Sequence, residues 1–266
     1  MSIEIPRREA MGGARAQIQV ISALFMREML TRFGTSRIGY VWLMAEPMIL
    51  GTMISLLHSL SGKDLPNGLP TFLFYALGYT PFLMFRSIVN RGSGAVTNNI
   101  SLLFHNRITL LDTMIARNLM EMLVCFTVCL LFIVMGMVVF HEVPHQPALL
   151  LAGWFMSALL AHGLAMVIGS AQVMMEWVEH LVHPFTYLLL PISAPFYMLD
   201  MLPQGTREAL LWNPLVSIHE LNRWAMFGDR INPYYDIPYV LAWILGLNLL
   251  GMAGLRVARP RLSLSD

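Results

Sequence analysis

The sequence predicts an all-α protein that crosses a membrane six times. Of its 266 residues, 56% are hydrophobic and only 12% are charged, whereas soluble domains carry about 25% charged residues. The apolar residues gather in runs of about 20, the length that crosses a bilayer as a helix. Basic residues are distributed unevenly between these runs, as in proteins whose loops face two different compartments. Together these observations predict a single membrane domain.

Residues 1–37 are expected to form a cytoplasmic N-terminus that includes an interfacial amphipathic helix. The first 17 residues are polar, and no signal peptide with a short apolar core follows them. The apolar residues just beyond them fall on one helical face: Ile18, Ile21, Phe25, Met29 and Phe33. The residues opposite them are Gln19, Arg27 and Thr31, and Gly34 is a plausible helix stop. This pattern predicts a helix that lies in the cytoplasmic membrane interface.

Residues 38–266 are expected to form the membrane domain with its six spans. The spans are predicted at residues 38–57, 70–89, 114–140, 149–171, 181–199 and 237–257. The fifth is the shortest of the six. Each is long enough, or nearly so, for a hydrocarbon core of about 30 Å.

The basic residues orient this arrangement with both termini in the cytoplasm. Of the 17 basic residues, 13 then lie in cytoplasmic segments and four lie outside. Cytoplasmic loops of membrane proteins carry such an excess of arginine and lysine. One loop departs from the rule, because Glu176 and Glu179 are its only charges.

The segment at about 200–236, between the last two spans, is predicted to be a re-entrant helical excursion. It is too long for a tight turn and too apolar for a solvated linker. Re-entrant backbone is tolerated only where protein or a wet cavity satisfies its polar groups. An interfacial cap with no transport role fits the same residues.

One cluster has the spacing of a metal site. Glu176, Glu179, His180 and His183 would share one face of a helix. Polar residues are nevertheless ordinary at a membrane boundary, and no second helix offers similar ligands, so no metal is expected. An intramembrane metal-dependent enzyme remains the alternative. Cys125 and Cys129 lie in an apolar run, where they are expected to behave as small hydrophobic residues.

Candidate binding residues lie before the first span and in or beside several spans. Arg27, Arg32 and Arg37 suit the phosphate of a substrate or a lipid, although ordinary positive-inside anchoring also explains them. Aromatic rings can line a sugar path by stacking on pyranose faces, and Glu46 is an ionisable group in an apolar run or at its interface. The path candidates are Tyr40, Trp42, Glu46, Phe82, Phe85, Tyr187 and Trp212.

Three blocks of sequence resemble permeases of ATP-binding-cassette polysaccharide exporters. RFGTSRIGYVWLMAEPMI (residues 32–49) is similar to the segment that opens their first span. ITLLDTMIARNLME (residues 108–121) resembles the capsule-export branch and is the most discriminating block. LPQGTREALLWNPLVSIHELNRWAMFG (residues 202–228) resembles the family's outer-face excursion. With the span pattern, the blocks cover nearly the whole chain.

The resemblance implies a homodimer docked on cytoplasmic ATPase subunits, with a translocation path between the two copies. The sequence contains no GxxxxGK[ST] phosphate loop, so ATP and Mg are expected on the partner ATPase and no cofactor on this chain. The resemblance also implies a coupling segment at about 98–113. The coupling candidates are His105, Asn106, Arg107, Asp112 and Arg117. Transport would be gated by a rigid-body shift, without covalent chemistry on this chain.

The same resemblance implies a place and a cargo. The chain is expected in a bacterial inner membrane, exporting a lipid-anchored acidic capsular polysaccharide from cytoplasm to periplasm. A periplasm-spanning accessory protein and an outer-membrane channel would receive the polymer, and no nucleic acid is expected as a partner. The alternative transport functions are export of O-antigen or teichoic acid by the same type of machine, and a passive channel.

Overall fold

The protein is all-α across the residues that the structure describes. This computed structural model describes residues 13–33, 37–62, 65–94 and 108–262, and among them it contains no strand. The side chains of residues 13–14, 32–33, 37–44, 46–47 and 261–262 also lie outside the described part. The all-α prediction is therefore confirmed for the described residues.

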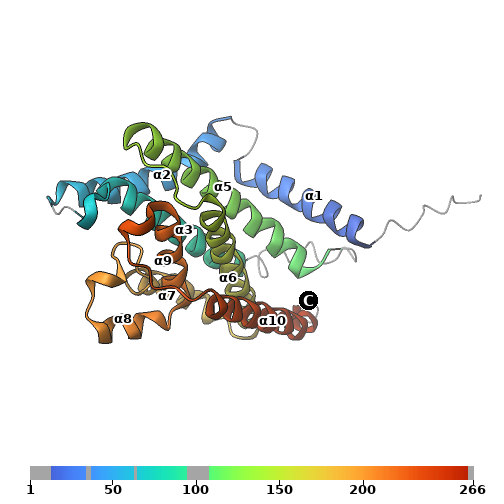
Figure 1. Ribbon diagram of the computed structural model, residues 1–266. Coiled ribbons are helices and arrows are strands. Elements are labelled where there is room, and N and C mark those ends of the chain that lie inside the picture. The colour runs from blue at the N-terminus through green and yellow to red at the C-terminus, as the bar shows by residue number, and fades with distance from the viewer. Residues whose placement is uncertain (1–12, 34–36, 63–64, 95–107, 263–266) are drawn as a thin grey trace, which may run out of the picture.

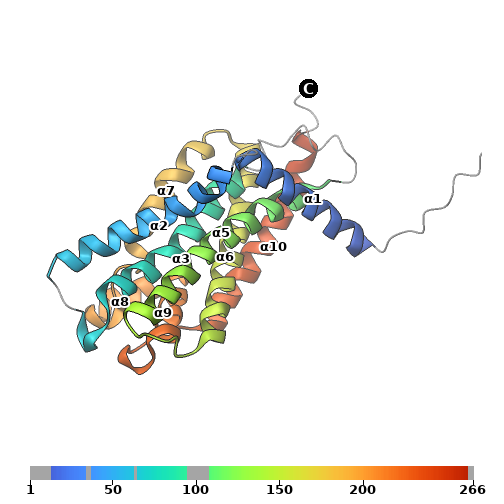
Figure 2. The ribbon, with the colours of Figure 1, turned by 90° about the horizontal axis from the view of Figure 1, so that it is seen from above.

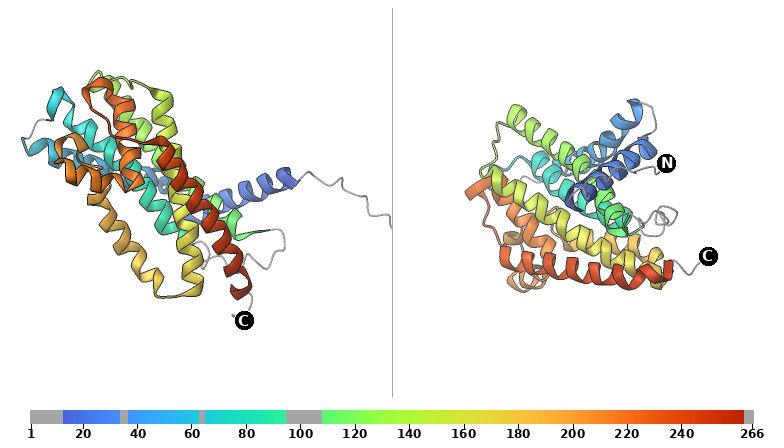
Figure 3. Two further views of the ribbon diagram at one scale, coloured as in Figure 1. Left: turned by 60° about the horizontal axis from the view of Figure 1, so that its bottom comes forward. Right: turned by 90° about the vertical axis from the view of Figure 1, so that its right-hand side faces the viewer.

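The longer helices form a bundle with shorter elements at its edges (Figure 1). They are α1 (Gly13–Phe33), α2 (Arg37–Leu60), α3 (Thr71–Ser93), α5 (Leu110–Val139), α6 (Pro147–Met174), α7 (Val178–Ile192) and α10 (Ile237–Leu262). The shorter elements are η1 (Pro66–Gly68), η3 (Leu199–Met201), α8 (Gln204–Leu211), α9 (Pro214–Phe227) and η4 (Gly228–Arg230). The helices α3, α5, α6 and α10 run side by side (Figure 2). Further views keep α1 and α2 on the side of the bundle opposite α10 (Figure 3).

Among the described residues, four helices are long and apolar enough to cross a membrane. They are α3, α5, α6 and residues 237–260 of α10. They match the predicted second, third, fourth and sixth spans. The other two predicted spans do not meet this criterion of length and hydrophobicity. The helix α7 has 15 residues and ends before residue 199. The apolar helix found within α2 is Met48–Leu60. The count of six therefore stays a prediction.

Local sequence signals set several helix ends. Thr109 and Asp112 form a capping box at the start of α5, so that each side chain accepts a hydrogen bond from the other residue's backbone N–H. The Asn213 side chain accepts a hydrogen bond from the Leu215 N–H at the start of α9, with Pro214 in the first turn. Gly228 ends α9 with a φ of 62°, a left-handed value that side chains disfavour.

Small residues bring α6 and α10 into close contact. A Cβ added at Gly251 would lie 2.5 Å from Met166 Cβ, and one added at Gly254 would lie 2.3 Å from Ser170 Oγ. Helices surrounded by lipid gain little from the hydrophobic effect, because lipid tails are as apolar as leucine. Close van der Waals packing of this kind is therefore what fixes the relative position of α6 and α10.

Two residues of the expected apolar face of α1 pack against α5. Phe25 and Met29 pack against Met120 and Val124 of α5, as that face requires. Ile18 is 64% exposed, so it does not belong to the packed face. The helix also exposes Met26 and Leu30, because its apolar residues are not confined to one stripe. Its location in the membrane interface remains a prediction.

The excursion between α7 and α10 is helical, as expected. It contains the short helices α8 and α9, and most residues of α9 are buried. Pro191 and the loop that begins at Ser193 end α7, which is why the predicted fifth span is shorter than expected. Whether the excursion enters the membrane stays a prediction.

Candidate functional site

A charged cavity lies at one end of the bundle. It has a volume of about 470 Å³ and is lined from α1, α3, α5, α6 and α7. Its ionisable lining residues are Glu28, Arg91, Arg117, Glu121, Glu179 and His183. Gln172 also lines it, and in the described part of the chain its Oε1 atom is buried without a hydrogen-bond partner.

Arg117 ties three helices together at the wall of this cavity. Its Nη2 and Nε atoms lie 2.7 Å and 2.8 Å from Glu28 Oε1 on α1. Its Nη1 atom donates to the Arg91 carbonyl on α3, at 3.2 Å. A charge-assisted contact made by two nitrogens of one guanidinium is more directional than a single ion pair. Arg117 therefore fixes α1 and the end of α3 against α5.

A second ion pair joins α3 to a buried carboxylate on α5. Arg91 Nη1 lies 3.5 Å from Glu121 Oε1. The Glu121 side chain is only 3% exposed, whereas the Arg91 side chain is 43% exposed. A buried carboxylate needs a cation nearby to remain charged. Arg91 thus provides a cation beside Glu121, and both residues line the cavity.

Asp112 is a structural residue at the start of α5. Its Oδ2 atom accepts from the Thr109 N–H at 3.0 Å and from the Thr109 hydroxyl at 2.7 Å. Its Oδ1 atom accepts from Gln17 Nε2 on α1 at 3.1 Å. The side chain is buried, with a relative exposure of 2%. Asp112 therefore holds the start of α5 against α1.

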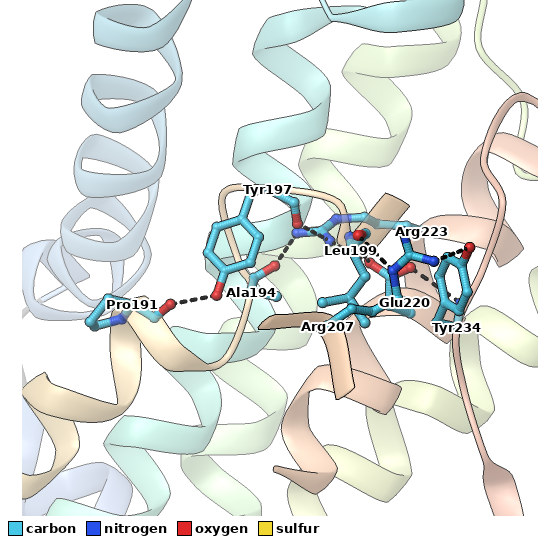
Figure 4. A network of polar contacts seen from close by, with 8 residues as sticks. All are labelled: Pro191, Ala194, Tyr197, Leu199, Arg207, Glu220, Arg223 and Tyr234. Carbon is cyan, nitrogen blue, oxygen red and sulfur yellow. Dashed lines mark hydrogen bonds and ion pairs between the residues drawn. The ribbon is translucent and has the colours of Figure 1, made fainter. Parts of the chain in front are cut away.

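A network centred on Glu220 and Arg223 links α9 to loops of the 193–236 segment (Figure 4), and none of the residues drawn lines the cavity. Arg223 Nη1 lies 3.1 Å from Glu220 Oε1 and 2.6 Å from the Tyr197 carbonyl, and Nη2 donates to the Ala194 carbonyl. Glu220 accepts from the Leu199 and Tyr234 N–H groups, both at 3.4 Å. The pair thus fastens two stretches of loop to α9.

Burial controls the ionisation of this network, which lies outside the four candidate spans. Burial raises the pKa of the Glu220 carboxyl, and the Arg223 charge and hydrogen bonds oppose that shift. Burial together with the Arg223 charge lowers the pKa of His219 to about 3. His219 is therefore a neutral imidazole at physiological pH, and Arg223 is the cation that faces Glu220.

The family of the chain follows from a comparison with known sequences. Residues 19–227 match the sequence profile of the family described as ABC-2 type transporter. That match begins within α1 and ends with α9, and it includes the residues that line the cavity as well as Glu220 and Arg223 of the network. The chain belongs to the ABC-2 type transporter family.

Individual relatives of this ABC-2 type chain are similar over most of their length. The capsule polysaccharide export inner-membrane protein BexB of Haemophilus influenzae is 32% identical over 237 residues, which cover 89% of each chain. CtrC of Neisseria meningitidis serogroup A, named as another capsule polysaccharide export inner-membrane protein, is 32% identical over 89% of this chain and 90% of its own. The polysialic acid transport protein KpsM of Escherichia coli is 31% identical over 92% of this chain and 95% of its own.

Several predicted site residues of this ABC-2 type chain fall outside the described part. His105, Asn106 and Arg107 lie in the range 95–107, which the structure does not describe. The same is true of the side chains of Arg32, Arg37, Tyr40, Trp42 and Glu46. Arg27 is described and exposed on α1, but the cavity is lined by its neighbour Glu28 instead.

The described path candidates differ widely in exposure. Phe82 and Phe85 are each 2% exposed within the protein, whereas Tyr187 and Trp212 are 57% and 78% exposed. None of these four lines the charged cavity. Their role as a translocation path therefore stays a prediction.

The cluster considered as an alternative metal site is not assembled in the described residues. Within the described ranges, no group of three or more histidine, cysteine, aspartate or glutamate side chains is placed to hold a metal ion. The expectation that four residues share one helix face was wrong for Glu176, because α7 begins at Val178. Glu179 and His183 instead line the charged cavity.

Sequence reasoning missed the carboxylates that organise this ABC-2 type chain. Glu121 had a usable signal, because it is an ionisable residue inside a predicted span. Glu220 and Arg223 had one too, because their i, i+3 spacing suits an ion pair on a helix. Glu28 had no signal, since a glutamate near the chain's N-terminal helix reads as an ordinary surface residue.

Proposed function

We propose that the chain is the membrane subunit of an ATP-driven exporter of lipid-anchored acidic capsular polysaccharide. The observation that carries the proposal is the similarity to relatives named for capsule polysaccharide export, over about nine-tenths of the chain. The E. coli relative is named for polysialic acid, an acidic polymer. Polymer would move from the cytoplasm to the periplasm across a bacterial inner membrane.

The proposed topology has six spans and both termini in the cytoplasm. Its support is that loops assigned to the outside meet at one end of the molecule. Arg230 forms an ion pair with Glu142, and its carbonyl accepts from Asn67 Nδ2 at 2.7 Å. These residues belong to three different predicted outer segments. Residues 1–37 would form the interfacial N-terminus, residues 38–266 the membrane domain, and residues 200–236 the outer re-entrant segment.

ATP hydrolysis is proposed to take place on a separate cytoplasmic subunit. The coupling segment at about 98–113 would rest on that subunit, with His105, Asn106 and Arg107 at the contact. Asp112 and Arg117 are proposed to act behind it, as positioning residues, because both contact α1. A push on the coupling segment would then move α1 and α5 as one rigid unit.

The complete machine is proposed to contain two copies of the chain and further envelope partners. The second copy would provide the other wall of the translocation path. A periplasm-spanning accessory protein and an outer-membrane polysaccharide channel would take the polymer onward. These partners follow from the capsule-export branch that residues 108–121 resemble.

The nearest alternative is the same machine with another cargo, O-antigen or teichoic acid. Capsule is favoured because the relatives that match are named for capsule polysaccharide export or polysialic acid transport. The intramembrane metal enzyme is not favoured, because its proposed ligands are not gathered in the described part of the structure.

The test is a deletion of the gene in its host, with complementation by the intact chain. Surface and intracellular polysaccharide are stained separately, and lipid-linked glycan is extracted from the membranes. The expected result is loss of surface capsule with glycan trapped inside on a phospholipid, reversed by complementation. Unchanged surface capsule would reject the capsule cargo, and a surface polymer of a different class that disappears would replace it.

A further inference from the structure

Arg86 and Tyr187 form an arginine–aromatic pair between α3 and α7. The Arg86 guanidinium carbon lies 3.6 Å from the centroid of the Tyr187 ring. This is the shortest of the arginine–aromatic distances recorded among the described residues. A guanidinium this close to a ring face is attracted to it electrostatically.

Arg86 differs from the three other arginines that lie over aromatic rings. Arg207 donates to the Leu199 carbonyl and to the Tyr234 hydroxyl, Arg223 pairs with Glu220, and Arg230 pairs with Glu142. Among the described residues, Arg86 has no recorded hydrogen bond or ion pair, and its Nε atom is buried without a partner. The other three are structural, whereas nothing in the described part of the fold uses the donors of Arg86.

The position of Arg86 makes this unused charge costly. It lies in α3, which is one of the four candidate membrane spans. At a rise of about 1.5 Å per residue, it is about 6 Å from the middle of that helix, on the side that leads to the charged cavity. Ionisable side chains at such depth usually face a partner, a wet cavity or a transport path.

The Arg86–Tyr187 pair is accessible to a ligand. Tyr187 is 57% exposed although Arg86 lies over its ring. One turn beyond Arg86, Asn90 accepts from the Thr186 hydroxyl at 3.1 Å and also lines the charged cavity. The contact between α3 and α7 therefore contains a cation, a partly exposed aromatic ring and a polar residue that leads toward that cavity.

We propose that Arg86 and Tyr187 bind the exported polymer, with the guanidinium pairing with an anionic group and the ring stacking on a sugar face. The anionic group is a carboxylate or a phosphate, for which the guanidinium geometry is matched. Stacking uses the apolar face of a pyranose ring. This inference rests on the proposed export function and names the residues that read the acidic character of the cargo.

The test uses complementation of the gene deletion by full-length variants, normalised to the amount of chain in the membrane. Arg86→Gln should lower surface polymer about tenfold or more and leave lipid-linked glycan inside the cell, since charge-assisted hydrogen bonds are lost. Arg86→Lys should retain part of the export because it keeps the charge. Tyr187→Phe should behave as the unchanged chain, and Tyr187→Leu should lose export several-fold. Arg256→Gln, at an exposed arginine of α10, is the matched control.

A second measurement separates the polymer from a membrane lipid as the source of the anion. The unchanged chain and Arg86→Gln are purified with their ATPase partner, and the phosphatidylglycerol retained by each is counted by native mass spectrometry. Impaired export with equal retained lipid supports the proposal. Impaired export with loss of a retained lipid overturns it in favour of a lipid headgroup, and normal export by Arg86→Gln overturns it outright. Failure of the unchanged chain to restore surface polymer would instead reject the export function itself.

Discussion

Carboxylates that are buried or partly buried hold segments of the chain together. Glu28 and Glu121 face Arg117 and Arg91 at the charged cavity, and Glu220 faces Arg223 at the network. The first two pairs join different helices, whereas Glu220 and Arg223 both belong to α9 and together hold the neighbouring loops against it. Because truncating one partner leaves the other charge buried and unpaired, these pairs are sensitive positions even where their net contribution to stability is small.

The Arg117–Glu28 pair is expected to hold α1 against α5. Glu28→Gln should weaken that attachment by about 1 kcal/mol, because the pair is partly exposed and thus screened by solvent. Hydrogen–deuterium exchange should rise in residues 13–33 and remain unchanged in α6. Arg15→Gln, at an exposed arginine of the same helix, serves as the control. If the double exchange Glu28→Arg with Arg117→Glu fails to restore protection, the attachment does not depend on this pair.

Substitutions of Asp112 distinguish its role in capping α5 from the role of its charge. The sequence-based prediction is that Asp112→Lys uncouples ATP hydrolysis from export while folded protein remains in the membrane. Asp112→Asn should keep most coupling, because an amide oxygen still accepts the capping hydrogen bonds, whereas Asp112→Ala should destabilise the start of α5 by about 1 kcal/mol. The measurement is polymer exported per ATP hydrolysed. Normal capsule at the surface of the lysine variant would rule out a role in coupling.

The Glu220–Arg223 pair is expected to decide whether the 193–236 segment folds. Glu220→Gln should lower the free energy of unfolding by about 3 kcal/mol, because a buried guanidinium loses its counter-ion. Thermal unfolding of the purified chain in detergent, followed by tryptophan fluorescence, measures this. The double variant Glu220→Met with Arg223→Met should recover much of the loss. An unchanged midpoint in the single variant would mean that backbone carbonyls alone satisfy Arg223.

At the scale of elements, close helix contacts replace the hydrophobic effect as the source of specificity. A Cβ added at Gly78 of α3 would lie 2.1 Å from the Pro195 carbonyl oxygen. That oxygen belongs to the backbone of the loop after α7, so it has little freedom to move. Gly78 therefore sets how closely α3 and this loop approach.

Gly78→Ala should destabilise the chain by about 1–3 kcal/mol, the usual range for overpacking. Gly246→Ala is the matched control, because nothing lies within 4 Å of a Cβ at that position of α10. The control should be neutral or gain up to about 1 kcal/mol from the better helix propensity of alanine. Equal melting temperatures for the two variants would show that the loop is free to shift.

At the scale of the whole molecule, two separate groups of charged residues lie at different places in the bundle. The charged cavity carries Arg91 and Arg117, whereas Asn67, Glu142 and Arg230 meet in the predicted outer segments. The helix α7 has Glu179 at the cavity, and its Pro191 carbonyl accepts from Tyr197 in the outer loop at 2.6 Å. Although α7 has only 15 residues, it connects the cavity to the loop that carries the network.

Cysteine labelling in intact spheroplasts checks the orientation. Ser61→Cys should react with a membrane-impermeant maleimide added outside, and Glu176→Cys should react only after the membrane is opened, because the six-span topology puts them on opposite sides. Both positions are exposed, and the native Cys125 and Cys129 are buried, so background reaction should be low. Labelling of both positions from outside would exclude the proposed topology.

The sequence by itself determined the helical class, the environment of the chain and four of its candidate spans. These follow from the length and periodicity of apolar runs, which are local properties read directly from neighbouring residues. The excursion after α7 was also predictable as helical, because Asn213-Pro214 and Gly228 are local start and stop signals. The resemblance of residues 108–121 pointed to the same family that the comparisons show.

Only the tertiary structure decided which polar residues meet. Glu28 and Arg117 are separated by 89 residues, and Gln17 and Asp112 by 95, so no local pattern links them. The residues from Glu176 to His183 illustrate the same limit. Their spacing puts all four on one face only if all four are helical, whereas the helix begins at Val178. The lack of a recorded hydrogen bond or ion pair at Arg86 likewise depends on which described side chains pack around it. Burial and pairing depend on which helices pack together, because the partners are supplied by segments far apart in the chain.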